Sequence, residues 1–552
     1  MPLPNRKGGS SVLVRILTVF TLLTSQAFAV VGNPKAPKGG TWQYNLGQQP
    51  TTLNALSSSD AYASTVQGYI IESLATRDID SYEFGPALAT SWETAKDGKS
   101  YTFTLREGVK WHDGKPFTVE DVKFSFDAIM DKENRYKTAH LKSYYENISE
   151  ARILDKHRIQ FFVKAPYFKN FDMVAGLSIV PKHLYSDLSK KNKKKLNKTL
   201  VGTGPYILSK FRRGKSLLLK KNKSWWGNND PLQKGVYNFD KILMRFIKDG
   251  TIAITRLTKG DVDFLGLSAE EFIKKTSGKK WDKKEVLKVK TKNKSPSGYG
   301  FVGWNLRNDL FRSKKTRMAL YHLLNRDLMI EKFDFGMNLP ATGPLYQQSI
   351  YANHKVKPVK YDPKLALKIL KEDGWRPGPD NILRKTFEGI EKRLSFTILE
   401  PNKEFVKYLT IYKQDALRAG VEIKIKYIEW TTFIKLLDER KFEAVRLGWG
   451  GGSVDWDPKQ IWHTDSIAGG GSNFIGYSNP EVDKLIDEAR LTFNKEKRIE
   501  LLGKVYKIIA EDVPYAFFFN AKYRFYAHTK RMKREKDTYK FGIGTDYWWI
   551  EK

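Results

Sequence analysis

The sequence predicts an α/β protein built of several lobes. At 552 residues the chain is too long for a single hydrophobic core, so two or three lobes are expected. Segments in which apolar residues recur every second position, as in strands, alternate along the chain with segments in which they have helical spacing. The sequence contains no internal repeat. Together these observations favour an α/β architecture with more than one core.

The N-terminus has the pattern of a secretory signal peptide. Basic residues precede a short apolar run at 16–23, and Ala27-Phe28-Ala29 has the small-x-small pattern of a cleavage site. We expect residues 1–29 to be removed and the mature chain to begin at Val30. No later stretch of the sequence approaches twenty apolar residues. The chain has no cysteine, which excludes disulfides, thiolate metal sites and a lipid-modified cysteine. The sequence therefore predicts a free periplasmic protein.

The formal net charge of +35 needs a reason, and removing Arg6, Lys7 and Arg15 still leaves +32. A nucleic-acid-binding protein would gather its basic residues on one face, interleaved with aromatic residues. Here the lysines are spread over the whole chain, with local runs at 190–195 and 274–284. We interpret the charge as a solvated surface and predict no nucleic-acid partner. The alternative interpretation is that the positive charge gives the protein a weak preference for anionic ligands or for a membrane surface.

The first part of the mature chain is predicted to open with a strand at 41–46. Residues 50–56 read as a turn into a helix, and Tyr69, Ile70 and Leu74 keep helical spacing. Further along, residues 151–164 show the alternation typical of a strand. Residues 192–199 are rich in lysine, and we expect them to lie on the surface where the chain turns back.

The stretch from Tyr101 to Asp127 is the most clearly patterned part of the sequence. It begins as a half-buried strand, because apolar and polar residues alternate. The Asp-Gly pair at 113–114 supplies a tight turn, and Thr118 begins a helix by capping the amide of Asp121. The helix has one apolar face, formed by Val122, Phe126 and Ile129. No residue of this stretch looks catalytic, so we expect a structural role.

The middle of the chain contains the expected lobe crossing. A turn at 202–206 (GTGPY) is followed by two strands of a hairpin, 206–211 and 216–222. The segment GDVDF at 260–264 reads as the end of a helix leading into a strand. Lys290 to Gly298 is polar, contains Pro296 and has no periodicity, so we expect the chain to pass there from one lobe to another.

The last third alternates strands and helices. A strand is expected at 301–306, a helix over 317–333, and a second helix over 361–374 that ends at Gly374. Three further strands separated by helices follow, then two helical patterns within 479–502 and a buried strand near the end (LSFTILE, VEIKIKYIE, FEAVRLGW and PYAFFFNA).

Several motifs match known catalytic or cofactor patterns but lack their context. Gly298 to Gly303 fits a dinucleotide fingerprint, yet it follows a polar linker and enters a strand. Ser277 to Lys280 fits S-x-x-K, but neither S-D-N nor K-T-G is present. The eight histidines include no zinc-binding spacing. We therefore predict no catalytic residue, no metal site and no cofactor.

The glycine loop, Val445 to Trp462 (VRLGWGGGSVDWDPKQIW), differs from these motifs. A strand ends near Gly448, and a run of glycines then exposes backbone beside tryptophans and aspartates. Exposed backbone, aromatic walls and carboxylates suit a pocket for an extended ligand that carries an amine. In the alternative interpretation the tryptophans pack in the core and the aspartates cap the next helix, a role that Asp457 before Pro458 fits.

Several separated motifs resemble, in the same order, the extracellular solute-binding proteins of peptide, nickel and opine ABC transporters, family 5. They are ALATSWE at 87–93, the stretch 101–127, GTGPY, RMALYHLLNRDLM at 317–329, YDPKLALKILKEDGW at 361–375 and YSNPEVDKLIDEA at 477–489. NPKAPKGG at 33–40, YNFDKILMRF at 237–246 and the terminal GTDYWWIE resemble the microcin C and oligopeptide-binding branch of that family.

The resemblance implies a periplasmic binding protein fold of type II, with two lobes around a ligand cleft plus an extra domain. Carried onto this chain, lobe I would comprise 30–66, 200–290 and 520–552, the extra domain 67–199, and lobe II 291–519.

The resemblance also implies binding residues. In peptide binders of the family an aspartate of the glycine loop holds the ligand's α-amine four residues before the proline; Val454 stands there, and Asp455 is the nearest match. The residues expected at the ligand are Ser59, Asp60, Ala61, Trp449, Gly450, Gly451, Asp455, Trp456, Phe519 and Asn520.

The expected function is capture without chemistry. The chain would bind oligopeptides or peptide-like solutes as a monomer and deliver them to an ABC permease in the inner membrane. An exported hydrolase acting on cell-wall peptides is the alternative, and it would require a nucleophile with a nearby base.

Overall fold

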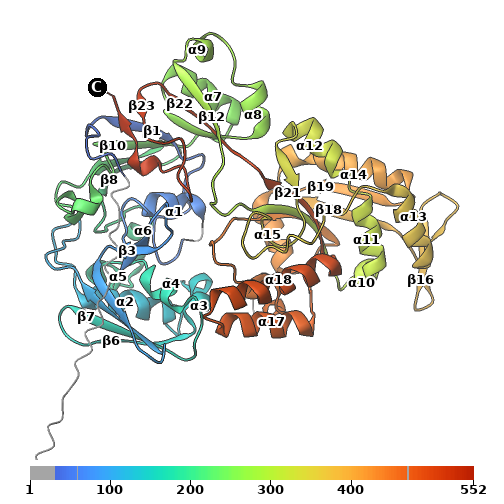
Figure 1. Cartoon of the computed structure of the whole chain (residues 1–552), viewed down its shortest axis with the longest axis horizontal. Coiled ribbons are helices and arrows are strands. Elements are labelled where there is room, and N and C mark those ends of the chain that lie inside the picture. The colour runs from blue at the N-terminus through green and yellow to red at the C-terminus, as the bar shows by residue number, and fades with distance from the viewer. Residues whose placement is uncertain (1–31, 59, 469–470, 552) are drawn as a thin grey trace, which may run out of the picture.

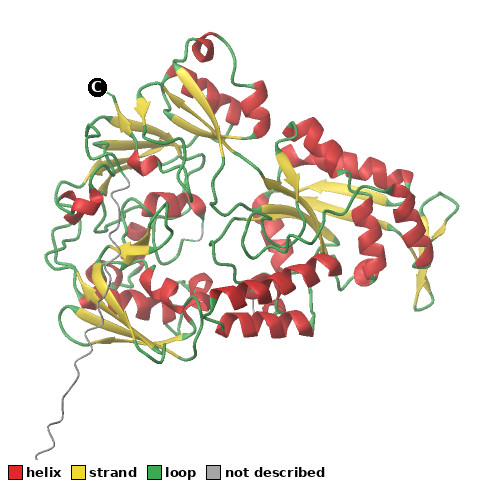
Figure 2. Ribbon diagram, viewed as in Figure 1, coloured by secondary structure: helices red, strands yellow, loops and turns green. Residues whose placement is uncertain are grey.

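The computed structural model of the chain describes residues 32–58, 60–468 and 471–551, so the predicted signal peptide and Ser59 lie outside the described residues. Three larger sheets and the helices around them make up the molecule, with a seven-stranded sheet on one side and a six-stranded sheet on the other (Figures 1 and 2). The part of the chain that the structure describes contains no helix long and apolar enough to cross a membrane.

The seven-stranded sheet is mixed: β1 runs parallel to both of its neighbours, and the other pairs are antiparallel. In order across the sheet its strands are β12 (Val286–Thr291), β22 (Arg524–Thr529), β11 (Phe264–Leu267), β1 (Thr41–Asn45), β10 (Lys241–Arg245), β9 (Ser216–Lys221) and β8 (Tyr206–Arg212). Its helices are α1 (Ala61–Gln67), α7 (Gly250–Lys259), α8 (Ala269–Lys274) and α9 (Lys279–Asp282). The hairpin expected after GTGPY is confirmed as β8 and β9.

The six-stranded sheet is also mixed, since β18 runs parallel to β19 and β20. Its order is β14 (Asn338–Pro340), β21 (Tyr515–Ala521), β13 (Tyr299–Trp304), β20 (Ala444–Trp449), β18 (Ser395–Glu400) and β19 (Glu422–Tyr427). Its helices are α10 (Asp309–Arg312), α11 (Lys314–His322), α12 (Arg326–Asp334), α13 (Pro363–Glu372), α14 (Val406–Arg418), α15 (Trp430–Asp438), α16 (Lys459–Trp462), α17 (Pro480–Leu491) and α18 (Lys495–Asp512). The largest hydrophobic core lies among these elements.

The four-stranded sheet has a core of its own, below the seven-stranded sheet in Figure 1. Its order is β4 (Ala89–Thr94), β5 (Ser100–Leu105), β7 (Arg158–Val163) and β6 (Ile148–Ile153). Its helices are α2 (Val119–Met130), α3 (Ala139–Tyr145), α4 (Asn170–Ala175), α5 (Lys182–Tyr185) and α6 (Lys190–Leu196).

The remaining strands form small sheets. They are β2 (Ala75–Arg77) with β3 (Phe84–Pro86), β15 (Arg376–Pro377) with β16 (Leu383–Phe387) and β17 (Ile390–Arg393), and β23 (Met532–Lys533) with β24 (Trp549–Ile550). Short 3₁₀ turns lie at η1 (Trp226–Asn228), η2 (Pro231–Gln233), η3 (Lys403–Phe405), η4 (Thr464–Ile467) and η5 (Thr545–Tyr547).

The stretch 101–127 folds as the sequence predicts. Strand β5 leads to the Asp-Gly turn, where Gly114 has φ +87°, and then to α2. The Asp121 carboxylate accepts a hydrogen bond from the Thr118 N–H at 3.0 Å, as part of a capping box. The apolar face of the helix, Val122, Phe126 and Ile129, is buried.

Two predicted helices are wrong in extent. Residues 69–74 are not helical, because Tyr69 and Ile70 give their carbonyls to Tyr206 and Gly204 in the GTGPY segment. The helix expected over 317–333 is broken into α11 and α12, and Asn325 caps the second of these by accepting a hydrogen bond from the Leu328 N–H at 3.1 Å. In both places a specific polar contact overrides an apolar periodicity.

The chain passes twice between the seven-stranded and six-stranded sheets. The first crossing (residues 292–298) joins β12 to β13, and the second crossing (residues 522–523) joins β21 to β22. The crossings are tied together, since the Arg524 guanidinium donates to the carbonyls of Ser295 and Pro296 at 3.2 and 3.1 Å. Two adjacent crossings are the geometry that lets two bodies hinge about a shared ligand.

Candidate ligand-binding site

The glycine loop lies with its backbone against the first crossing. A Cβ atom at Gly451 would lie 2.3 Å from the Pro296 carbonyl oxygen, and one at Gly298 would lie 2.2 Å from the Trp449 carbonyl oxygen. Neither position can carry a side chain without moving backbone. The glycines therefore bring the loop onto the segment that joins the two large sheets.

Four of the expected binding residues come together beside this contact. Tyr299 of β13 is paired with Trp449 on one side and with Asn520 on the other. The buried Asn520 side chain accepts a hydrogen bond from the Gln347 N–H at 3.2 Å and donates to the Gly298 carbonyl at 3.4 Å. Phe519 is half-buried beside Tyr408, with ring centroids 5.8 Å apart. The structure thus gathers Trp449, Gly451, Phe519 and Asn520 at one end of the six-stranded sheet.

The two tryptophans of the loop make packing contacts. The Trp449 ring lies against Phe301 and Phe474, with centroid distances of 6.3 and 5.7 Å. Trp456 is 8% exposed and meets the edge of Tyr506 on α18. Both rings fix the loop to its own sheet and helices, as the structural alternative for this loop expects.

The two aspartates of the loop are held by residues from distant parts of the chain. The Tyr351 hydroxyl donates to Asp455 at 2.7 Å, and an Arg498 nitrogen lies 4.0 Å from the same carboxylate. Asp457 accepts a hydrogen bond from the Lys459 N–H at 3.1 Å, the capping role expected for it, and a second from the Tyr167 hydroxyl. Sequence reasoning missed these partners because no local pattern links them to the loop.

Asp60 and Ala61 lie at the start of α1, which packs in the core of the seven-stranded sheet and not in that of the glycine loop's sheet. Asp60 caps α1 by accepting hydrogen bonds from the Ala63 N–H at 2.7 Å and from the Thr51 hydroxyl at 2.6 Å. Ala61 is exposed. Among the described residues, no hydrogen bond or ion pair joins either of them to the glycine loop.

A buried ion pair at β20, the strand with which the glycine loop begins, was missed by the sequence analysis. Glu400, at the end of β18, is fully buried, and its carboxylate lies 3.6 Å from Arg446 of β20. The Arg446 guanidinium also stacks on Phe405, 3.2 Å from the ring centroid. Burial raises the pKa of Glu400 to about 7, although Arg446 opposes the shift, and burial lowers the pKa of Arg446 to about 10.

The pH dependence of stability tests this pair through Glu400→Gln. The pKa of Glu400 rises from 4.5 to about 7 on folding, so the folded state holds a proton that the unfolded state loses. Stability should therefore fall as pH rises across this window and level off above it, by about 3 kcal/mol from this group. Urea unfolding at several pH values should show the fall in the parent protein and a flatter profile in the variant. Parallel profiles would contradict the assignment.

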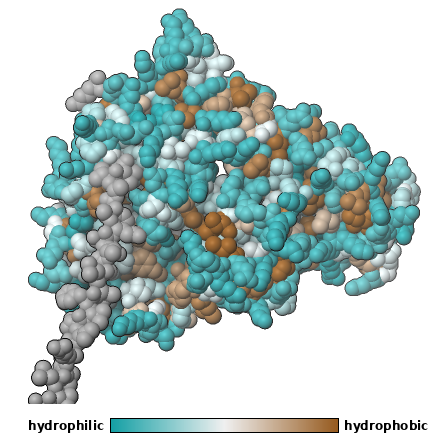
Figure 3. Space-filling view, viewed as in Figure 1, coloured by the Kyte–Doolittle hydropathy of each residue, from teal (hydrophilic) through white to brown (hydrophobic). Residues whose placement is uncertain are grey.

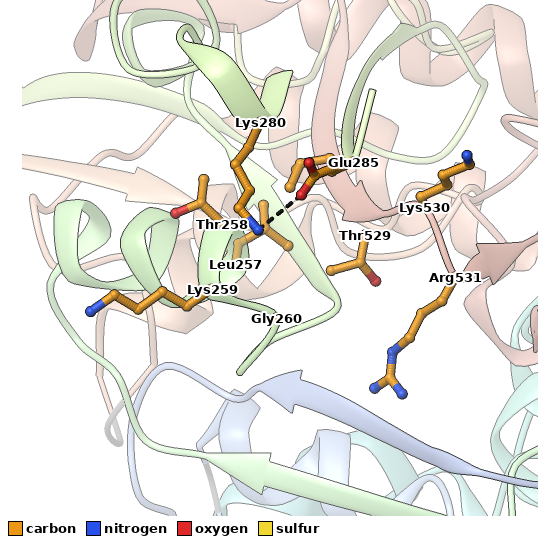
Figure 4. Close-up of a pocket in the computed structure, with 10 residues that line it drawn as sticks. Leu257, Thr258, Lys259, Gly260, Lys280, Glu285, Thr529, Lys530 and Arg531 are labelled. Atoms are coloured by element: carbon orange, nitrogen blue, oxygen red, sulfur yellow. Dashed lines mark ion pairs between the residues drawn. The ribbon is translucent and has the colours of Figure 1, made fainter. Parts of the chain in front are cut away.

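A separate cavity of about 390 Å³ lies beside α7, α9 and β12 (Figure 4). Basic side chains surround it, and the Lys280 ammonium turns toward Glu285 to form an ion pair of 2.9 Å. The residues that line it are Leu257, Thr258, Lys259, Gly260, Lys280, Glu285, Val286, Thr529, Lys530 and Arg531. None of the expected binding residues lies among them.

Comparison with known proteins identifies the family. Residues 83–471 match the model of the bacterial extracellular solute-binding proteins, family 5, middle region. The chain belongs to this family. Its members are binding proteins, which agrees with the expectation of a binding protein rather than an enzyme.

Three relatives match between 79% and 96% of the chain. The oligopeptide-binding protein AppA of Bacillus subtilis (strain 168) is 26% identical over 545 residues, which cover 96% of this chain and 93% of AppA. The dipeptide-binding protein of Escherichia coli (strain K12) is 26% identical over 459 residues, 79% and 81% of the two chains. The heme-binding protein A of Haemophilus influenzae is 25% identical over 489 residues, 85% and 84% of the two chains.

Solved structures confirm the fold. AppA from Bacillus subtilis in complex with a nonapeptide superposes with a TM-score of 0.80 at 24% identity, covering 94% of this chain and all of AppA. NikZ from Campylobacter jejuni in complex with Ni(L-His) gives a TM-score of 0.76 at 24% identity, with coverages of 94% and 100%. The predicted periplasmic binding protein fold is confirmed.

Proposed function

We propose that this chain is the substrate-binding component of an ABC importer and captures oligopeptides or peptide-like solutes. The observation that carries the proposal is the match to the oligopeptide-binding protein AppA over 96% of the chain. Relatives named as dipeptide-binding and di/tripeptide-binding proteins support the same class of ligand.

The proposed binding residues lie at the glycine loop and across from it. The backbone at Gly450 and Gly451 would offer hydrogen bonds to an extended peptide, in the manner of an added strand. Asp455, Trp449, Trp456, Phe519 and Asn520 would form the rest of this wall. Ser59, Asp60 and Ala61 would close the site from lobe I.

Ligand capture would favour a closed arrangement of the lobes. A ligand that touches both lobes binds the closed state better and shifts the population toward it. In the structure Lys407 of α14 and Glu270 of α8 already form an ion pair of 2.7 Å, which joins a helix of the six-stranded sheet to a helix of the seven-stranded sheet. Of the lobe boundaries expected from the sequence, those at 290 and 519 lie near the two crossings and would carry this motion, whereas those at 66 and 199 delimit the extra domain of lobe I.

The remaining parts of the proposal concern the cell. We expect a periplasmic protein released by cleavage after residue 29, a permease in the inner membrane as partner, and a monomer in solution. The absence of cysteine from the sequence fits an unanchored protein. The face in Figure 3 is mostly hydrophilic with several scattered apolar patches, which is compatible with a secreted protein of this charge. Similarity to the microcin C branch is proposed from the motifs at 33–40, 237–246 and 544–551 alone.

Intrinsic tryptophan fluorescence tests the proposal, because the chain has 14 tryptophans. Titration of the mature protein with a peptide mixture should give a saturable change, and the peptides should be recovered unchanged after denaturation. A nickel–histidine chelate and heme serve as matched non-peptide ligands. A response to either of these with none to peptides would contradict the ligand class. Cleaved peptides would support an exported hydrolase instead.

A further inference from the structure

The segment that enters α4 reaches across to the helices of the six-stranded sheet. The Phe168 N–H donates to the Arg490 carbonyl at 3.1 Å, so a backbone hydrogen bond links the start of α4 to the end of α17. The Arg498 guanidinium of α18 lies over the Phe168 ring, 4.3 Å from its centroid. Figure 1 shows α3 and α4 directly beside α17 and α18. The body built on the four-stranded sheet is therefore in direct contact with the helices of the six-stranded sheet.

Tyr167 makes the strongest polar contact of this segment. Its hydroxyl donates to the Asp457 carboxylate at 2.5 Å, and a hydroxyl bonds more strongly to a carboxylate than to a neutral acceptor. The Arg490 guanidinium lies 3.5 Å from the same carboxylate and covers the Tyr167 ring, 4.4 Å from its centroid. Tyr167 thus inserts between an acid of the glycine loop and a base of α17, and contacts both of them.

Two weaker hydrogen bonds join the same two bodies. The Tyr82 hydroxyl, between β2 and β3, accepts from the Val454 N–H of the glycine loop at 3.4 Å. The Tyr144 hydroxyl of α3 donates to the Gln460 side chain of α16 at 3.3 Å. We define the clasp as the four aromatic residues that make these contacts, Tyr82, Tyr144, Tyr167 and Phe168. All of the clasp partners belong to the glycine loop, α16, α17 or α18.

The seven-stranded and six-stranded sheets meet at a different place, close to the second crossing. There Ala269 and Phe525 form a small apolar cluster with Met337, and the Lys407–Glu270 ion pair joins helices of the two sheets. In Figure 1 this contact, at α8 and β22, lies above, and the clasp helices α3 and α4 lie below. A rotation about the crossings moves nearby groups least and distant groups most. The clasp is therefore the contact that parts when the lobes open.

We propose that the clasp holds the lobes closed over the ligand, and that Tyr167 is the positioning residue that determines how long the ligand stays bound. The Tyr167–Asp457 hydrogen bond forms only in the closed arrangement, so it lowers the free energy of that state alone and raises its population. Asp457 is then the acceptor of the clasp as well as a helix cap. The inference rests on the proposed function, because a closed state matters only where a ligand is captured.

Double electron–electron resonance measures the two populations directly, and the absence of cysteine from the sequence leaves no native thiol to remove. Spin labels are placed through Lys156→Cys, between β6 and β7, and Lys484→Cys, on α17, which replace exposed lysines. In the mature protein without added peptide, Tyr167→Phe should raise the ratio of the long-distance to the short-distance population about tenfold, because a hydrogen bond to a carboxylate is lost. The matched control is Tyr136→Phe, whose ring packs on Phe124 within the same body, and it should leave the ratio unchanged.

Ligand release gives the functional readout. The protein is loaded with a fluorescein-labelled tryptic peptide mixture, which is then chased with the unlabelled mixture. Release from Tyr167→Phe should be about tenfold faster than from the parent protein, since the same hydrogen bond must break before the lobes open. Release from Tyr136→Phe should keep the parent rate.

Each other outcome has a distinct meaning. Equal population ratios in the parent protein and in a folded Tyr167→Phe variant contradict the clasp, whatever the ligand is. A ratio that rises equally in Tyr136→Phe shows general loosening of this body and contradicts the role of Tyr167. An unchanged release rate despite a changed ratio contradicts the claim about residence time. A changed ratio in a protein that binds no peptide supports the clasp and rejects the proposed function.

Discussion

Asp263→Ala is expected to lower the free energy of unfolding by about 3–5 kcal/mol. Asp263 is fully buried between α7 and β11. Its carboxylate accepts hydrogen bonds from the Gln43 N–H and the Thr529 hydroxyl, both at 2.8 Å, and from the Arg531 guanidinium at 2.7 and 2.6 Å. Removing it leaves the Gln43 N–H and the Thr529 hydroxyl without this acceptor and takes the counter-ion from Arg531, whose guanidinium keeps a hydrogen bond to the Thr41 carbonyl. The substitution should therefore weaken the link between β1 and the C-terminal part of the chain.

Asp261→Ala is the matched control for this effect. Asp261 lies two residues earlier and pairs with Arg256 at 2.8 Å, but both side chains are exposed. Its loss should cost no more than about 1 kcal/mol. Urea unfolding of both variants by circular dichroism measures the difference, and equal losses would show that the Asp263 network does not stabilise the sheet.

Gly202→Ala is expected to cost about 3 kcal/mol, because an added methyl group has no space. A Cβ atom at Gly202 would lie 1.8 Å from the Ile70 carbonyl oxygen, which belongs to backbone and cannot rotate away. The neighbouring Gly204 N–H donates to that same oxygen at 2.9 Å. The substitution should therefore break the contact between the GTGPY segment and residues 69–70.

Gly266→Ala provides the comparison. Gly266 lies in β11 of the same sheet, and a Cβ atom there would meet nothing within 4 Å. Its effect should stay within about 1 kcal/mol, since alanine fits an extended backbone. Thermal unfolding of the two variants should give a clearly lower midpoint temperature for Gly202→Ala than for Gly266→Ala, because only the first substitution causes a steric clash. Similar midpoint temperatures would contradict the steric explanation.

Much of the fold could be predicted from the sequence where local chemistry decides it. The stretch 101–127 is an example, since alternation, an Asp-Gly turn and a capping box all lie within it. The first crossing was also predicted, from a polar segment without periodicity. The helix assigned around 69–74 failed because distant backbone groups at 204 and 206 take its carbonyls, and no local pattern records that contact.

The site was predictable only in part, for the same reason. Composition identified the glycine loop, and the structure explains Gly451 by the close approach of the first crossing. Tyr351, Arg498 and Tyr167 could not be found, because each reaches the loop from a different part of the chain. The Glu400–Arg446 pair likewise joins two strands that lie side by side only after folding.

The most direct test of the account is mass spectrometry of the ligand that leaves the natively purified protein on denaturation. The account predicts peptides or peptide-like molecules, intact and in near-stoichiometric amount. Heme, a metal chelate or an opine as the bound molecule, without any peptide, would contradict it.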